Sequence, residues 1–214
     1  MVDSMDTTAI LNPIRVTSLD SEELRWYRTL RRPAEHHREG IFIAEGEKVV
    51  RRLLESHLRV LSLLLTDDWF GIYRPLLEQR SPPPIVYLAP QLLLEMIVGF
   101  PLHQGIMAVA KIPPPEKIET MLSSKPHPFF LAAVDGLTNA ENLGVLVRNC
   151  AAFGVQALLV GETSSSPYLR RAVRNSMGAV FRLPIVPVTR LADTLQALRT
   201  RHGITCLAAH PRPS

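Results

Sequence analysis

Short apolar runs alternate with amphipathic segments along most of the chain, and this pattern predicts an α/β fold. In the first half, the apolar runs VLSLLLT (60–66) and GIMAVA (105–110) flank segments with helical spacing such as EKVVRRLLESH (47–57). Apolar runs of four to eight residues are typical of buried strands, whereas apolar residues three and four positions apart are typical of helices. We therefore expect a small α/β domain with a mostly internal sheet.

The N-terminal region is expected to contain a tail and one helix. Residues 1–18 are polar and are predicted to be a flexible tail, and residues 19–32 (LDSEELRWYRTLRR) are predicted to be helical. Ser21 could cap this helix, and Pro33 is expected to stop it.

A change of composition divides the chain. Residues 112–128 are rich in proline, serine and charge, which predicts a linker between a domain at 19–111 and a second domain at 129–214. The second domain repeats the alternation, and its four strand candidates are FFLAAVD (129–135), VQALLVG (155–161), LPIVPV (183–188) and ITCLAA (204–209). Helical crossovers between them predict a parallel sheet that is buried on both faces.

Charge is distributed unevenly between the two halves. Residues 1–115 carry 13 basic and 14 acidic side chains, residues 116–214 carry 11 and 6, and 20 of the 24 basic residues are arginine. Arginine forms bidentate contacts to phosphate and stacks on bases, so a nucleic-acid partner is plausible, and an ordinary basic surface is the alternative.

The chain has no strong sign of export, membrane insertion or metal binding. Cys150 and Cys206 lack the spacing of a metal site or a disulfide framework, and no apolar run reaches the roughly 18 residues of a membrane helix. We expect a cytoplasmic protein without a metal or a membrane partner. His36 and His37 are expected to be a solvent-facing pair, and Cys150 a core residue.

The most informative segment is DGLTNAENLGVLVRNCAAFGV (135–155), a strand end followed by a polar loop and a mostly apolar helix. Arg148 is the only charged residue of its apolar part, and Gly144 lies one turn earlier on the same face, where it would leave space beside the guanidinium. A buried arginine requires an anion, which could be Asp135, Glu141 or a bound phosphate. Physical reasoning alone favours the internal ion pair.

This segment resembles the first motif of the SpoU (TrmH-type) methyltransferases of the SPOUT superfamily, an Asn-x-Gly-x-x-x-Arg pattern followed by Ala-x-Phe-Gly. Asn142, Gly144 and Arg148 match it. The resemblance implies a methyl transfer from S-adenosylmethionine to a ribose 2′-hydroxyl of tRNA or rRNA, with Arg148 and Asn142 as catalytic residues. It also implies a homodimer that acts on RNA and not on DNA.

A second segment, SPYLRRAVRNSMGAVFRLPIV (166–186), is similar to the family's stretch of basic residues before Ser-x-Gly-Ala and Leu-Pro. The matching residues are Ser176, Gly178, Ala179, Leu183 and Pro184. Arg170, Arg171, Arg174 and Ser176 are the expected RNA-binding residues. Three arginines within about one helical turn could grip neighbouring phosphates, and a solvated helix face is the alternative.

The first domain resembles the RNA substrate-binding domain that precedes the catalytic domain in many SpoU enzymes. Gly40, Glu45, Gly46, Gln104 and Gly105 carry this looser similarity. The resemblance thus implies this domain at 19–111, followed by a parallel-sheet domain of the trefoil-knot family.

One departure from the family concerns the methyl donor. The family's Gly-x-Glu-Gly-x-Gly loop and Ser-Leu-Asn segment, which supply most of the cofactor pocket and the knot, have no counterpart before Ser214. We therefore expect a methyltransferase domain that lacks its C-terminal part, with the cofactor-binding residues unassigned. A non-catalytic RNA-binding protein is the alternative.

Overall fold

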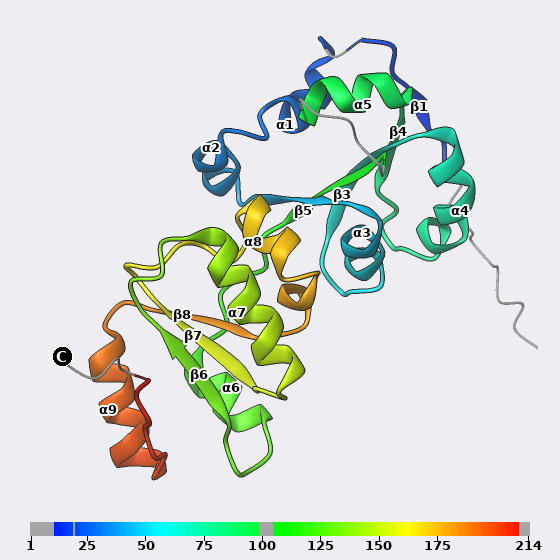
Figure 1. Cartoon of the computed structure of the whole chain (residues 1–214). Helices are drawn as coiled ribbons and strands as arrows, with labels where there is room; N and C mark the ends of the chain where they lie inside the picture. The colour runs from blue at the N-terminus through cyan, green and yellow to red at the C-terminus, as the bar shows by residue number, and fades with distance from the viewer. Residues whose placement is uncertain (1–10, 19, 99–104, 210–214) are drawn as a thin grey trace, which may run out of the picture.

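The computed structural model describes residues 11–18, 20–98 and 105–209 and contains two β-sheets (Figure 1). The first sheet has the order β1-β4-β3-β5-β2. Its strands are β1 (Ile14–Arg15), β2 (Ile41–Glu45), β3 (Val60–Leu65), β4 (Ile85–Leu88) and β5 (Ile106–Lys111). Strand β5 runs antiparallel to both β2 and β3, and the other pairs are parallel, so the sheet is mixed.

Helices cover both faces of this sheet. They are α1 (Arg25–Arg28), α2 (Pro33–Arg38), α3 (Glu47–Leu54), α4 (Asp67–Glu78) and α5 (Gln91–Val98), with a short 3₁₀ turn at Glu22–Leu24. Side chains of α1 and α5 form one core with the sheet, and side chains of α3 and α4 form another on the opposite face. Every residue of β2 is buried, as an apolar run covered on both sides predicts.

The second sheet is parallel, as predicted, with the order β6-β7-β8. Its strands are β6 (Leu131–Val134), β7 (Ala157–Gly161) and β8 (Ile185–Val188). The helices are α6 (Ile118–Ser124), α7 (Ala140–Ala152), α8 (Arg170–Asn175) and α9 (Leu191–His202), with a 3₁₀ turn at Ala179–Phe181. Helices α6 and α9 pack on one face, and α7 packs on the other.

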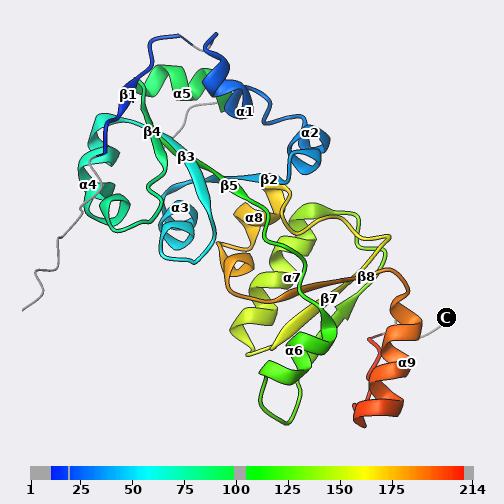
Figure 2. The ribbon, with the colours of Figure 1, turned by 180° about the vertical axis from the view of Figure 1, so that it is seen from behind.

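The two sheets share a continuous apolar core. Phe42 of β2 stacks on Phe181 and is tilted against Tyr168, with ring centroids 5.6 Å apart in both pairs. Helix α8 lies between β2 and α7 in both views of the ribbon (Figures 1 and 2). The first domain therefore packs directly on the helix that carries the predicted RNA-binding arginines.

The structure corrects the predictions for the N-terminal region. Ile14–Arg15 of the predicted tail pair with β4, and Arg15 Nη2 lies 2.8 Å from Asp67 Oδ1. Pro33 occupies the first turn of α2, where its missing N–H costs no hydrogen bond, so it begins a helix as well as following one. Of the helix expected over residues 19–32, the described residues 20–32 form only the 3₁₀ turn and α1, and residues 1–10 and 19 of the two predictions lie outside the described residues.

Two further predictions were wrong. The expected linker at 112–128 contains α6, whose Met121 and Leu122 are buried against the second sheet. Residues 204–209 form no strand, and Leu207 is exposed, because no strand among the described residues pairs with this apolar run. The pattern of apolar residues does not reveal whether a pairing partner is present.

Candidate functional site

Helix α7 presents the predicted catalytic residues to solvent. Asn139 caps the helix, because its side chain accepts hydrogen bonds from the backbone N–H groups of Glu141 and Asn142 at 2.9 and 3.0 Å. The buried face consists of Leu143, Gly144, Val147 and Cys150. Asn142 and Arg148 are both exposed.

The internal ion pair expected for Arg148 is not formed. Arg148 makes no hydrogen bond or ion pair with any residue that the structure describes. The prediction assumed a buried arginine, whereas an exposed guanidinium needs no protein anion because water solvates it. Arg148 is therefore available to an external ligand.

The two carboxylates that could have met Arg148 have other partners. Asp135 Oδ1 accepts hydrogen bonds from the Thr163 hydroxyl and, at 2.9 Å, from the Gly136 N–H. The Thr163 hydrogen bond lowers the pKa of Asp135 below its usual value. Glu141 Oε1 lies 3.5 Å from Arg171 Nη1.

Asn142 and Arg148 do not lie side by side. Six residues of an α-helix correspond to a rise of about 9 Å and to a rotation that leaves the two side chains roughly 120° apart. A single small ligand on one face of α7 would therefore not contact both. An extended chain that crosses the exposed side of the helix could meet one after the other.

Gly144 serves a different purpose from the predicted one. A Cβ atom at this position would lie 2.4 Å from the Ala172 carbonyl oxygen and 2.8 Å from Asn175 Cβ. The space beside Gly144 is thus filled by α8 and not by Arg148. The glycine permits the close approach of α7 and α8.

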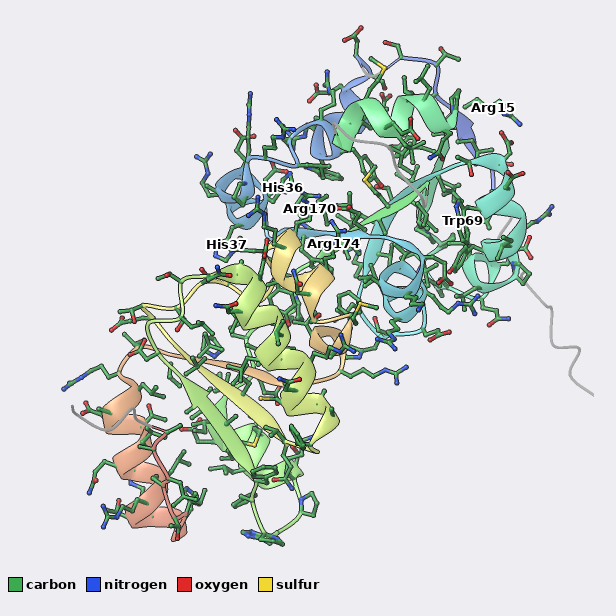
Figure 3. All side chains as sticks on the ribbon, viewed as in Figure 1. Arg15, His36, His37, Trp69, Arg170 and Arg174 are labelled. Atoms are coloured by element: carbon green, nitrogen blue, oxygen red, sulfur yellow. The ribbon has the colours of Figure 1, made fainter. Side chains whose placement is uncertain are left out.

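The three arginines of α8 have unequal surroundings, and Figure 3 labels two of them, Arg170 and Arg174. Arg170 Nη1 hydrogen-bonds Glu45 Oε2, and its side chain is only 23% exposed. Arg174 Nη1 lies 3.5 Å from Glu45 Oε1, and its side chain is 59% exposed. The side chain of Arg171 is 72% exposed. These arginines and Asn175 line, together with Glu141, a cleft of about 380 Å³.

Ser176 is not placed for RNA contact. It is fully buried, its Oγ donates to the Val173 carbonyl at 2.7 Å, and the Gly178 N–H donates to the same Oγ at 3.2 Å. The hydroxyl therefore stabilises the turn after α8, in which Gly178 adopts a φ of 80°. The sequence motif gave no sign of this burial, because Ser-x-Gly fits an exposed phosphate-binding turn equally well.

In the first domain, the matched residues have mainly conformational roles. Gly40 and Gly46 have φ values of 63° and 89°, and a Cβ at Gly105 would lie 2.9 Å from the Thr66 methyl group. Gln104 lies outside the described residues. Glu45 is the exception, because it is a buried carboxylate paired with two arginines of α8.

The histidine pair is asymmetric, contrary to the prediction. His36 is 6% exposed, and its Nε2 lies 2.9 Å from Thr29 Oγ1, whereas His37 is exposed. Burial lowers the pKa of His36. Cys150 is buried as predicted, and burial raises the pKa of its thiol.

A second cleft, of about 580 Å³, lies at the carboxyl ends of β7 and β8, the edge at which open α/β sheets bind ligands. Glu162, Ser164 and Thr189 contribute polar groups, and Ile185 and Val188 contribute apolar surface. Among the residues that the structure covers, no group of three or more His, Cys, Asp or Glu side chains could hold a metal ion. No helix within the same ranges is long and apolar enough to cross a membrane.

Two α/β domains, the second of which carries a cleft lined by three arginines of α8, define a protein suited to an anionic ligand. Comparison with known sequences is more specific. The family model described as the SpoU rRNA Methylase family matches residues 130–214. An uncharacterized tRNA/rRNA methyltransferase of Mycobacterium bovis is 31% identical over 216 residues, which cover 98% of this chain and 70% of that protein.

Two other comparisons agree. The 23S rRNA (guanosine-2′-O-)-methyltransferase RlmB of Pasteurella multocida is 35% identical over 107 residues, which cover 48% of this chain and 42% of that protein. The structure of an AdoMet-bound rRNA methyltransferase from Sinorhizobium meliloti has the same fold, with a TM-score of 0.73 at 20% identity over 88% of this chain and 69% of that one. The chain belongs to the SpoU family of RNA methyltransferases.

Proposed function

We propose that this protein transfers a methyl group from S-adenosylmethionine to a ribose 2′-hydroxyl of tRNA or rRNA. The observation that carries the proposal is Arg148, which lies at the family's arginine position and has no partner among the described residues. A cation held on a rigid helix without an internal anion is free to bind a substrate phosphate or hydroxyl. The guanosine-2′-O specificity in the name of the Pasteurella relative supports the ribose hydroxyl as acceptor.

Arg148 would act by positioning and charge. S-adenosylmethionine, when bound, would supply an electrophilic methyl group for the ribose 2′-oxygen, whose proton would pass to water. A guanidinium has N–H donors and no hydrogen-bond acceptor, so Arg148 would orient the hydroxyl and stabilise its developing negative charge. Such positioning of reactants supplies a large part of the rate in transfer reactions.

The arginines of α8 would hold the RNA backbone. Arg171 and Arg174 are the better candidates, because both are more than half exposed and their ion pairs have N–O distances of 3.5 Å. Arg170 is held by a buried carboxylate and would contribute less. Asn142, in the first turn of α7 beside Glu141, would contact the ribose or phosphate of a neighbouring nucleotide.

The described residues do not enclose the methyl donor by themselves. Ligand sites usually cover most of the surface of a bound small molecule, whereas the cleft beside β7 and β8 is only partly enclosed by the described residues. The residues that would hold S-adenosylmethionine are therefore not part of the proposal. A cytoplasmic homodimer, as the family implies, is part of the proposal.

Substitution of Arg148 tests the catalytic assignment. We expect Arg148→Ala to lower the methylation rate by about 10²-fold or more, the loss typical of removing one preorganised electrostatic group. Arg148→Lys keeps the charge but not the planar fork, so an intermediate rate would separate charge from geometry. The rate is measured as transfer of labelled methyl groups to RNA, and resistance of the modified linkage to alkali identifies the 2′-oxygen as acceptor.

Arg190→Ala is a matched control, because Arg190 is exposed and pairs only locally with Asp193. A near wild-type rate in Arg148→Ala, with the same rate in Arg190→Ala, would remove Arg148 from the mechanism. Circular dichroism of both variants would verify that they are folded.

A second candidate function is RNA binding without catalysis, which the open cleft favours. Titration calorimetry with S-adenosylmethionine discriminates between the two functions. Micromolar binding would support the enzyme, whereas RNA binding without donor binding would support the non-catalytic alternative.

A further inference from the structure

Glu45 ends β2 and is the buried anion at the junction of the two domains. Its side chain is 6% exposed, and each carboxylate oxygen meets a different arginine of α8, with Oε2 on Arg170 and Oε1 on Arg174. A buried carboxylate is costly unless it is paired and hydrogen-bonded. The pairing therefore constrains the side chains of both arginines.

Other contacts hold α8 and its flanking residues against the first domain. Phe42 contacts the rings of Tyr168 and Phe181, which precede and follow α8. The Arg52 guanidinium donates a hydrogen bond to the Met177 carbonyl, just after the helix. The backbone of α8 is thus fixed by apolar packing and by this hydrogen bond, while Glu45 determines where two of its guanidinium groups point.

The two arginines paired with Glu45 differ in what they can still offer. Arg170 is largely covered, whereas Arg174 is 59% exposed and lines the cleft with Arg171. A guanidinium has five N–H donors in a fixed plane, and the contact with Glu45 involves one nitrogen of Arg174. The remaining donors of Arg174 are available to a phosphate.

We propose that Glu45 is a positioning residue that orients Arg174 for an RNA phosphate across the domain junction. The proposal rests on the RNA-binding function proposed above. A long arginine side chain loses much rotamer freedom when it binds, and a partner that holds it in place in the free protein reduces this cost. The first domain would in this way affect RNA affinity without contacting the RNA through Glu45.

Charge and positioning predict opposite effects of one substitution. Glu45→Gln removes a negative charge close to two arginines, so long-range electrostatics alone would raise the affinity for RNA. If positioning dominates, the affinity falls although the protein becomes more positive. Glu141→Gln is the matched control, because it removes a charge beside Arg171 from an exposed pair that orders the side chain weakly.

The experiment measures fluorescence anisotropy of a labelled RNA stem-loop over a range of salt concentrations. We expect Glu45→Gln to weaken binding by about tenfold, and we expect the slope of log K against log salt to become shallower by about 0.9, the value for one phosphate contact. Glu141→Gln is expected to keep or raise the affinity. Glu45→Asp, which retains the charge on a shorter side chain, is expected to restore part of the loss.

A double-mutant cycle with Arg174→Gln distinguishes positioning from a general structural role. If Glu45 acts through Arg174, Glu45→Gln has little further effect on affinity in the Arg174→Gln background. A full additional loss there, or a gain of affinity in Glu45→Gln alone, would overturn the proposal. Thermal unfolding of each variant identifies any loss of folded protein, and Glu45→Asp keeps the test valid if Glu45→Gln unfolds.

The same binding measurements distinguish failure of the proposed RNA-binding function from failure of the positioning role of Glu45. If the wild-type protein does not bind the stem-loop, the RNA-binding function and the positioning role fall together. If the wild type binds and Arg174→Gln weakens binding while Glu45→Gln does not, the RNA site stands and only the role of Glu45 is refuted.

Discussion

Gly144→Ala is expected to destabilise the protein, although alanine is normally the better helix former. The added Cβ would lie 2.4 Å from the Ala172 carbonyl oxygen, 3.0 Å from Ala172 Cα and 2.8 Å from Asn175 Cβ. Two of these three atoms belong to the backbone of α8, so a rotamer change cannot relieve the overlap. Helix α8 must move away from α7, by about 1 Å if the Cβ–O distance is to reach ordinary van der Waals contact.

The magnitude follows from two opposing effects. Overpacking a well-packed contact costs about 1–3 kcal/mol, and replacing glycine by alanine within a helix gains about 1 kcal/mol. A backbone clash places the cost at the upper end, so we expect a net loss of about 1–2 kcal/mol in the free energy of unfolding. For a chain of this size, this corresponds to a decrease in Tm of about 2–8 °C.

Gly71→Ala provides the matched control. Gly71 lies in α4, is exposed, and has no atom within 4 Å of an added Cβ. This substitution should raise the free energy of unfolding by up to about 1 kcal/mol, because only the helix propensity changes. Differential scanning calorimetry of the two variants compares the same chemical change with and without the clash. An increase in Tm for Gly144→Ala similar to that for Gly71→Ala would refute the close approach of α7 and α8.

Two further predictions concern titration. Burial lowers the pKa of His36 in the folded protein. Below the ordinary histidine pKa of about 6.5, the unfolded state therefore binds more protons than the folded state. The free energy of unfolding should fall as the pH decreases from this value. Urea unfolding between pH 5 and 8 should show a smaller decrease for His36→Gln and an unchanged one for the exposed control His37→Gln; identical curves for all three proteins would contradict this. In Gly161→Ala, the new Cβ would approach the Asp135 carboxylate and displace it from its hydrogen bonds, so the pKa of Asp135 measured by NMR should rise toward its ordinary value. An unchanged pKa would argue against the predicted displacement.

The local pattern of apolar and polar residues predicted the strands and helices that bury their own apolar residues. The apolar runs at β3, β5 and β7 are continuous because helices cover both faces of the sheets, and the amphipathic segments between them gave α3, α4 and α7. Strand β1 was missed, because two residues carry no period and its hydrogen bonds come from β4, which is distant in sequence. The strand expected at 204–209 is absent for the converse reason, since the run is apolar but no strand in the described part of the chain pairs with it.

The side chains of the candidate site show the same limit, because the sequence does not indicate which atoms surround them. The motif identified Asn142 and Arg148, and the structure leaves both exposed, but nothing in the sequence pattern indicated that His36 and Ser176 are buried. Gly144 was recognised as a position that needs space, whereas the atom that needs it belongs to α8. A single sequence can indicate that a residue such as Gly144 is important, but it does not indicate which residues of other helices or strands pack against it.

For the arginines of α8, the difference between identical residues in the sequence and different surroundings in the structure affects the proposed function. Arg170 and Arg171 are adjacent and chemically identical, and a motif assigns them the same role. On a short helix between two domains, however, adjacent side chains point about 100° apart, so Arg170 meets the buried carboxylate of Glu45 while Arg171 is 72% exposed. The first domain therefore divides a uniform basic segment, because it covers Arg170 and leaves Arg171 and Arg174 more than half exposed. In the proposed function, this division makes Glu45 as relevant to RNA binding as the arginines themselves, although Glu45 ends a strand whose pattern indicates only a structural role.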